Sequence, residues 1–136
     1  MQPDAAAPLV LVVDDYDDAR EMYAESLLAS GFRVAEATNG LEAVECARTL
    51  APDVVLMDLS LPGLDGWEAT RRLKADERTR HIPVVALTGH VLASALAAAR
   101  QAGCDRFVIK PALPDVVVEE VRRAIRKPSA GFSQAS

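Results

Sequence analysis

The stretch "VVLMDLSLPGLDGW" (residues 54–67) joins a run of apolar residues to an acid, Asp58, followed by a turn and the start of a helix. A continuously apolar run is typical of a strand that is covered on both faces of a parallel sheet. Burying a carboxylate directly after such a run is costly unless the carboxylate is paired or has a function. The stretch therefore predicts a central strand with a functional acid at its end.

Four other short apolar runs recur along the chain. They cover residues 9–13, 33–37, 84–87 and 106–109. Segments with helical periodicity lie between and after the five runs, at residues 18–30, 40–50, 65–75, 91–103 and 113–127. This alternation of strands and helices predicts right-handed βαβ units and an α/β fold with a parallel sheet.

Two of the helical patterns indicate which side chains face the core. In 18–30 we expect Met22, Leu27 and Leu28 to be buried, with Gly31 as the C-cap. In 113–127 the expected core positions are Val117, Val118, Val121 and Ile125.

Composition limits the classes of protein to which the chain can belong. Its 136 residues suit one domain, and its net charge of −5 disfavours a nucleic-acid-binding face. No apolar run approaches the ~18 residues of a membrane span, and the N-terminus lacks a secretory signal pattern. Cys46 and Cys104 are isolated, so we expect two buried thiols in a reducing, cytoplasmic compartment. The domain is expected at 8–127, with disordered ends at 1–7 and 128–136.

Polar side chains follow four of the five predicted strands. They are Asp14 and Asp15, Asp58, Thr88, and Lys110. Ligands of an open parallel sheet bind outside the carboxyl ends of its strands, so these residues form a candidate site. Each residue also has a simpler interpretation: a helix N-cap for the first two acids, a strand end for Thr88, and an ordinary turn for Lys110. Lys74 and Lys127 are expected on helix surfaces, whereas Lys110 ends a buried strand.

The chemistry of the candidate site follows from its charges. Two carboxylates ~4 Å apart repel each other by ~4 kcal/mol near a protein surface, and a bound Mg²⁺ would relieve that repulsion. An aspartate such as Asp58 can act as a nucleophile and form an aspartyl phosphate. Lys110 and the Thr88 hydroxyl could then stabilise the phosphoryl oxygens.

Four motifs follow one another along the chain: "VVDD" (12–15), "PDVVLMDLSLPGLDGWE" (52–68), "PVVALTG" (83–89) and "AGCDRFVIKP" (102–111). With them, the chain resembles the receiver domain of bacterial two-component response regulators, similar to single-domain chemotaxis regulators, from about Pro8 to Lys127. The resemblance implies a flavodoxin-like (βα)₅ fold with a doubly wound five-stranded parallel sheet in the order 2-1-3-4-5.

The resemblance also implies a role for each site residue. Asp58 would be the phosphoacceptor, with Thr88 as the switch hydroxyl and Lys110 as a phosphate ligand. Mg²⁺, with Mn²⁺ as a substitute, would bind Asp14, Asp15, Asp58 and the backbone carbonyl of Ser60. Two further implications are a cis peptide at Lys110–Pro111 and a switching aromatic at Phe107, whose alternative role is a core residue.

The implied function is a signalling switch. A histidine kinase or histidine phosphotransfer protein would donate the phosphoryl group, and the face formed by 91–103, 106–109 and 113–127 would control binding of a downstream protein. The expected molecule is a monomer or a weak activation-dependent dimer, with no direct nucleic-acid or membrane partner and no catalysis beyond its own phosphorylation and dephosphorylation.

Several alternatives stay open at this point. The chain could be a receiver cut from a larger regulator or hybrid kinase, although we favour a stand-alone protein. A phosphohydrolase with an aspartate nucleophile usually carries a second acid two residues later, where this chain has Ser60. A nucleotide- or flavin-binding module is disfavoured because "DDYDDA" (14–19) is acidic and lacks glycine. Trp67 could lie near the site or pack into its helix, and His90 could tune phosphoryl lifetime or be an ordinary exposed loop residue.

Overall fold

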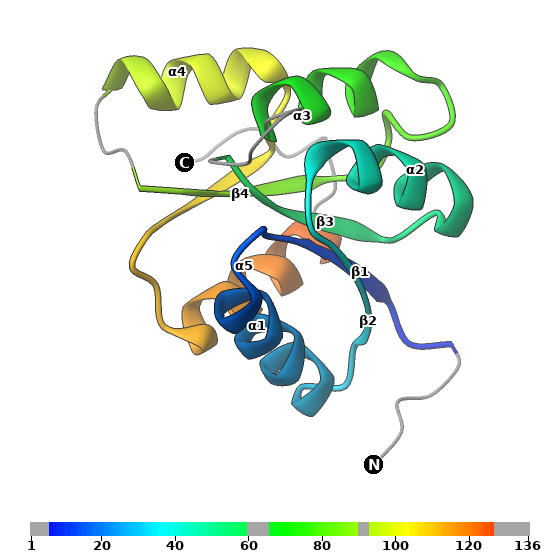
Figure 1. Cartoon of the computed structure of the whole chain (residues 1–136), viewed down its shortest axis with the longest axis vertical. Helices are drawn as coiled ribbons and strands as arrows, with labels where there is room; N and C mark the ends of the chain where they lie inside the picture. The colour runs from blue at the N-terminus through cyan, green and yellow to red at the C-terminus, as the bar shows by residue number, and fades with distance from the viewer. Residues whose placement is uncertain (1–5, 60–65, 90–92, 127–136) are drawn as a thin grey trace.

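The computed structural model describes residues 6–59, 66–89 and 93–126. Within these ranges strands and helices alternate (Figure 1). The strands are β1 (Leu9–Val13), β2 (Arg33–Ala37), β3 (Val54–Asp58), β4 (Val84–Thr88) and β5 (Arg106–Ile109). The helices are α1 (Asp17–Ala29), α2 (Gly40–Leu50), α3 (Gly66–Ala75), α4 (Ala93–Ala102) and α5 (Pro114–Arg126). The predicted strand–helix alternation is confirmed.

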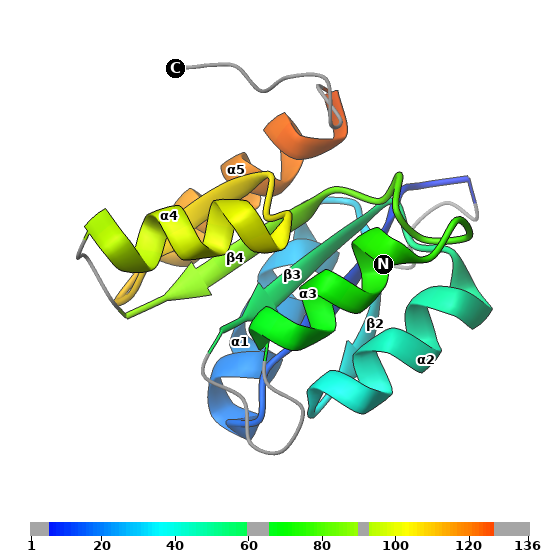
Figure 2. The ribbon, with the colours of Figure 1, turned by 90° about the horizontal axis from the view of Figure 1, so that it is seen from above.

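The strands form one parallel sheet in the order β2-β1-β3-β4-β5. Val13 at the end of β1 lies opposite both Ala37 of β2 and Met57 of β3, so the carboxyl ends of these strands line up. Helices α1 and α5 cover one face, and α2, α3 and α4 lie on the other (Figures 1 and 2). This arrangement confirms the doubly wound, flavodoxin-like order 2-1-3-4-5.

Alternation along the strands explains why both faces are covered. In β1, Val10 and Val12 pack with apolar side chains of α1 and α5, whereas Leu11 and Val13 pack with those of α2 and α3. β3 and β4 are buried along their whole lengths. Full burial of a Val or Leu side chain contributes ~1.5–3 kcal/mol, so the central strands hold their carboxyl ends firmly in place.

The prediction for the buried face of α1 is partly wrong. Leu27 is fully buried, but Met22 and Leu28 are 39% and 43% exposed. The residues that accompany Leu27 in the core are Tyr23 and Ala24. Helical geometry explains the difference, because Tyr23 is one turn before Leu27 at i,i+4, whereas positions five residues before and one after point away from that face. The C-cap is Ser30 and not the predicted Gly31, which follows it at C′ in the left-handed region with a φ of +97°.

Three other predictions about burial meet mixed outcomes. In α5, Val117, Val118 and Val121 are buried as expected, and Ile125 is only partly buried. Cys104 is buried, but Cys46 is only partly buried, because α2 is a surface helix and Cys46 sits at the margin of its apolar face.

The surface assignment of Lys74 is wrong. Its side chain is 18% exposed, and its ammonium group donates to three acceptors between the end of α3 and the starts of β4 and β5. Lys127 lies outside the described residues. Among the helices described, none has the length and apolarity needed to cross a membrane.

Candidate phosphoacceptor and metal site

The predicted site residues come together at the carboxyl edge of the sheet. Asp14 and Asp15 follow β1, and Lys110 follows β5. Asp58 and Thr88 are the last residues of β3 and β4, one residue beyond the strand ends predicted from sequence. Asp58 lies opposite Leu87 in the ladder, which puts Thr88 one residue further along the neighbouring strand.

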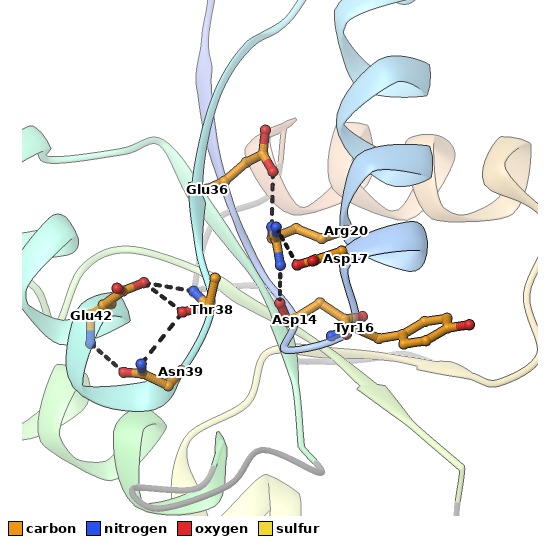
Figure 3. A network of polar contacts seen from close by, with 8 residues as sticks. All are labelled: Asp14, Tyr16, Asp17, Arg20, Glu36, Thr38, Asn39 and Glu42. Carbon is orange, nitrogen blue, oxygen red and sulfur yellow. Dashed lines mark hydrogen bonds and ion pairs between the residues drawn. The ribbon is translucent and has the colours of Figure 1, made fainter.

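Asp14 is almost completely enclosed, with 1% of its surface exposed. Its N–H donates to the carbonyl of Ala37 at 3.1 Å, and its side-chain Oδ1 accepts from the N–H of Tyr16 at 2.9 Å. Its carbonyl accepts from Arg20 Nη1 at 3.0 Å (Figure 3). The remaining polar atom, Oδ2, is buried and has no hydrogen-bond partner among the described residues.

The N-cap alternative for the two acids is not supported. The N-cap of α1 is Tyr16, whose own side chain makes no capping hydrogen bond. Asp14 bonds to the N–H of Tyr16 itself, which lies outside the helix. Asp17 and Asp18 occupy the first helical turn, where negative charge is favoured by the helix dipole. Asp14 and Asp15 are therefore extra acids that the helix does not need.

Asp58 forms an ion pair with Lys110. Its side chain is 3% exposed, and its Oδ2 lies 3.1 Å from Lys110 Nζ. The backbone of the same lysine is fixed by a 2.8 Å hydrogen bond from its N–H to the carbonyl of Thr88. The predicted cis peptide between Lys110 and Pro111 is also present. A buried carboxylate thus faces the cationic side chain of Lys110 at the edge of the sheet.

The three acids crowd each other. One carboxylate oxygen from each of Asp14, Asp15 and Asp58 lies within 4.8 Å of the other two. Burial raises the pKa of Asp14, the bond from Tyr16 opposes this, and the charge of Asp58 adds to the increase. Lys110 offsets only part of this negative charge. The unfolded chain has no such crowding, so the site is held together against its own electrostatics by the core beneath it.

The donor set fits a hard divalent cation. All of its ligand atoms are carboxylate oxygens, which Mg²⁺ prefers together with retained waters. Asp14 Oδ2 is a buried oxygen without a protein partner among the described residues, and Asp15 is exposed, so solvent can reach the cluster. Ser60, the expected backbone ligand, and His90 lie outside the described residues.

Phe107 and Trp67 both pack against the core cluster on the α2–α3 face. Phe107 is half-buried, lies opposite the small side chain of Ala86 in the ladder, and has the guanidinium of Arg100 5.7 Å from its ring centroid. Thr88 and Phe107 share one face of the sheet, because Ala86 is two residues before Thr88. Trp67 lies in the first turn of α3 and is half-buried.

Two residues of the site escaped the sequence-based analysis. Gly66 begins α3 against the backbone of Asp58 and Leu59, and a Cβ at Gly66 would lie 2.7 Å from Leu59 Cα and would also overlap the Asp58 carbonyl. The sequence feature that could have identified Gly66 is a glycine at the start of a helix, a few residues after Asp58. Arg20, one turn into α1, holds the backbone of Asp14. Its role depends on Glu36 of β2, which no local pattern reveals.

Comparison with known proteins agrees with this geometry. Residues 10–122 match the model of the response regulator receiver domain. The chain belongs to this family. The polar-differentiation response regulator DivK of Brucella anthropi is 35% identical over 113 residues, covering 83% of this chain and 92% of that protein.

Two solved structures extend the similarity to three dimensions. The receiver domain of the sensor histidine kinase PA1611 of Pseudomonas aeruginosa is 32% identical, has a TM-score of 0.82, and covers 89% of this chain and 99% of its own. That structure has a magnesium ion coordinated in the active-site cleft. The chemotaxis protein CheY4 of Vibrio cholerae is 25% identical, with a TM-score of 0.83 and coverage of 87% and 98%. The chain is thus a receiver domain of two-component signalling.

Proposed function

We propose that this receiver domain is a phosphorylation switch in which Asp58 accepts a phosphoryl group from a phosphohistidine. The observation that carries the proposal is the environment of the Asp58 carboxylate. It is buried at a strand end, 3.1 Å from Lys110 Nζ and within 4.8 Å of oxygens of two further acids. Its donor would be a histidine kinase or a histidine phosphotransfer protein, the partners of this family.

In the transfer step, an Asp58 carboxylate oxygen bonds to phosphorus while the bond from phosphorus to the imidazole nitrogen of the donor breaks. The imidazole leaves with the electron pair of that bond. Lys110 balances negative charge on the phosphoryl oxygens, and the Thr88 hydroxyl donates a hydrogen bond to one of them. Hydrolysis of the acyl phosphate later restores the carboxylate, so the chain turns over no substrate except its own phosphoryl group.

Asp14, Asp15 and Asp58 would hold Mg²⁺, with Mn²⁺ as a substitute and the carbonyl of Ser60 as a further ligand. When bound, the cation neutralises charge among the carboxylates and on the incoming phosphoryl group. Asp14 Oδ2 has no partner in the part of the chain that the structure describes, and this supports the assignment, since the surrounding protein already satisfies the other polar atoms of Asp14.

The signal would pass from Thr88 to the face of α4, β5 and α5. A phosphoryl group brings up to ~2 negative charges, toward which the Thr88 hydroxyl can move, and Phe107 on the same face of the sheet can fill the vacated space. Reversing a 1:99 equilibrium takes ~5.5 kcal/mol, and one charge-assisted hydrogen bond supplies ~1.5–3 kcal/mol. We therefore propose a partial switch that a downstream partner completes. Exposed Ile109, Leu113 and Val116 offer that partner apolar contacts.

Phosphorylation by acetyl phosphate and Mg²⁺, followed by intact mass, tests the assignment. The wild type and Asp105→Asn should each gain one phosphoryl group, and Asp58→Asn should gain none. Equal incorporation in Asp58→Asn would refute Asp58 as the acceptor. Steady turnover of p-nitrophenyl phosphate would instead indicate a phosphohydrolase.

Beryllofluoride, a phosphoryl mimic, tests the switch. It should shift the amide NMR signals of Phe107 and α4 as well as those near Asp58. In Thr88→Ala the mimic should still bind while the distant shifts shrink. Full-sized shifts at Phe107 in this variant would rule out the route through Thr88.

A further inference from the structure

We propose that Arg20 is a positioning residue of the metal site: it fixes the backbone of Asp14 so that Oδ2 stays directed at the cation. The inference rests on the proposed Mg²⁺ site and adds a residue that is not itself a ligand. Arg20 lies on α1, and its side chain is 11% exposed despite its charge.

The guanidinium of Arg20 joins three segments of the chain (Figure 3). Nη1 donates to the carbonyl of Asp14 at 3.0 Å, and Nη2 donates to Asp17 Oδ1 at 2.7 Å. Nε donates to Glu36 Oε1 on β2 at 2.9 Å. A planar fork of fixed donors suits this task, because the two carboxylates orient the plane and leave Nη1 aimed at the carbonyl.

These contacts complete the fixation of Asp14. Its N–H is already held by Ala37 of β2, and its Oδ1 by the N–H of Tyr16. Arg20 holds its carbonyl and is itself anchored to Glu36, so the peptide groups on both sides of Asp14 are tied to the same neighbouring strand. The one atom left for a ligand is Oδ2, which is buried and unpartnered among the described residues. Outer-shell partners that orient ligands in this way typically change metal affinity by about 10- to 100-fold when removed.

Charge and positioning predict opposite results for Arg20. Arg20 is a cation near a cation site, so removing it should tighten Mg²⁺ binding if only its charge matters. If Arg20 positions Asp14, removing it should weaken binding, because Oδ2 then samples other directions. The sign of the change therefore separates the two explanations.

Arg33 provides a matched control. It is also an arginine whose Nε donates to a backbone carbonyl, that of Ala7 at 2.8 Å, but it stands at the start of β2, away from the acids. Arg33→Gln removes the same charge and the same kind of bond as Arg20→Gln. Arg20→Lys keeps the charge, and a lysine can supply a single donor to the Asp14 carbonyl.

Calorimetric titration with MgCl₂ on the full chain tests the inference. We expect Arg20→Gln to bind Mg²⁺ about 10-fold more weakly, Arg20→Lys to fall between it and the wild type, and Arg33→Gln to match the wild type. In metal-free protein, the amide NMR signals of Asp15 and Tyr16 should move in Arg20→Gln and stay in place in Arg33→Gln. If Arg20→Gln does not fold, the Arg20→Lys comparison decides.

Unchanged or tighter Mg²⁺ binding in Arg20→Gln, or in Arg20→Lys where that variant decides, would overturn the positioning role. Failure of the metal site itself looks different: wild-type protein would not bind Mg²⁺, or Asp14→Asn would bind it as well as the wild type. That result would overturn the proposed site together with the role of Arg20.

Discussion

Lys110 and Asp58 meet at the carboxyl edge of the sheet, with Nζ and Oδ2 3.1 Å apart. Lys74 and Asp105 meet at the amino edge of β4 and β5, with the same two atoms 3.0 Å apart. We refer to them as the carboxyl-edge pair and the amino-edge pair. By distance and residue type the two pairs are alike, and their surroundings distinguish them.

The amino-edge pair is satisfied by the protein. The three donors of the Lys74 ammonium have three acceptors: the carbonyls of Arg80 and Ile82, and Asp105 Oδ2. Asp105 Oδ2 also accepts from the N–H of Val84, the first residue of β4. This pair ties α3, β4 and β5 together.

The carboxyl-edge pair stands among excess charge. One lysine faces three carboxylates, and Asp14 Oδ2 has no partner among the described residues. The comparison teaches that an ion pair alone says little about function. The indication of a ligand site is the charge and the hydrogen-bonding capacity that the protein leaves unsatisfied.

The largest expected contrast is in the stability of the metal-free protein. Asp58→Asn removes one of three crowded carboxylates and should raise the free energy of unfolding by about 1 to 4 kcal/mol. The lower figure is the repulsion of two charges ~4 Å apart in bulk water, and the upper figure is their repulsion near a protein surface. Asp105→Asn removes a charge that is fully used and should lower the free energy of unfolding by about 1.5–3 kcal/mol. Urea denaturation of both variants in EDTA measures the two changes.

Mg²⁺ sharpens this contrast. Saturating Mg²⁺ should stabilise the wild type and Asp105→Asn, by ~2.7 kcal/mol at a concentration 100 times the Kd, and should stabilise Asp58→Asn less. A loss of stability in metal-free Asp58→Asn as large as that in Asp105→Asn would show that the two pairs are both structural.

The sequence was sufficient to predict the sheet and the meeting of the strand-end residues. Apolar runs such as 54–57 are typical of central strands when helical patterns lie between them, and the carboxyl ends of neighbouring parallel strands meet at one edge. Lys110 was identifiable because a lysine that ends a buried strand needs an explanation. Lys74 and Arg20 were not identifiable, because helical periodicity places them near the surface and their partners come from distant segments, such as Asp105 and Glu36. Local patterns describe which face a residue occupies, and tertiary contacts decide what it binds.

Two glycines give the next contrast, because one packs against the carboxyl-edge pair and the other against the amino-edge pair. Gly66 touches the backbone of Asp58, and Gly103, with a φ of +109°, lies where a Cβ would be 2.6 Å from Lys74 Cγ. Both Gly66→Ala and Gly103→Ala should lower the free energy of unfolding by about 1–3 kcal/mol, through overpacking and backbone strain. Only Gly66→Ala should also slow phosphorylation by acetyl phosphate, because it displaces Asp58.

Gly89→Ala is the control for the glycine variants. Among the described residues, a Cβ at Gly89 meets nothing within 4 Å, and the φ of Gly89 is not in the left-handed region, so phosphorylation and stability should change little. Equal phosphorylation rates in Gly66→Ala and Gly103→Ala would mean that the close approach of α3 does not position Asp58.

The last contrast concerns Cys104, which adjoins Asp105 at the amino edge. Burial raises the pKa of Cys104 to about 11, with a hydrogen bond to Thr70 acting in the opposite direction, so the buried thiol is almost entirely protonated and unreactive at pH 8. In a Cys46→Ser background Cys104 should react with a thiol reagent only when the amino edge opens. Labelling at pH 8 should then be about 10-fold faster for each 1.4 kcal/mol by which Asp105→Asn destabilises the protein, and no faster in Asp58→Asn. If labelling of Cys104 is accelerated equally in Asp105→Asn and Asp58→Asn, the motions that expose Cys104 do not distinguish the two edges of the sheet. The amino-edge pair would then not be the interaction that protects Cys104 from the reagent.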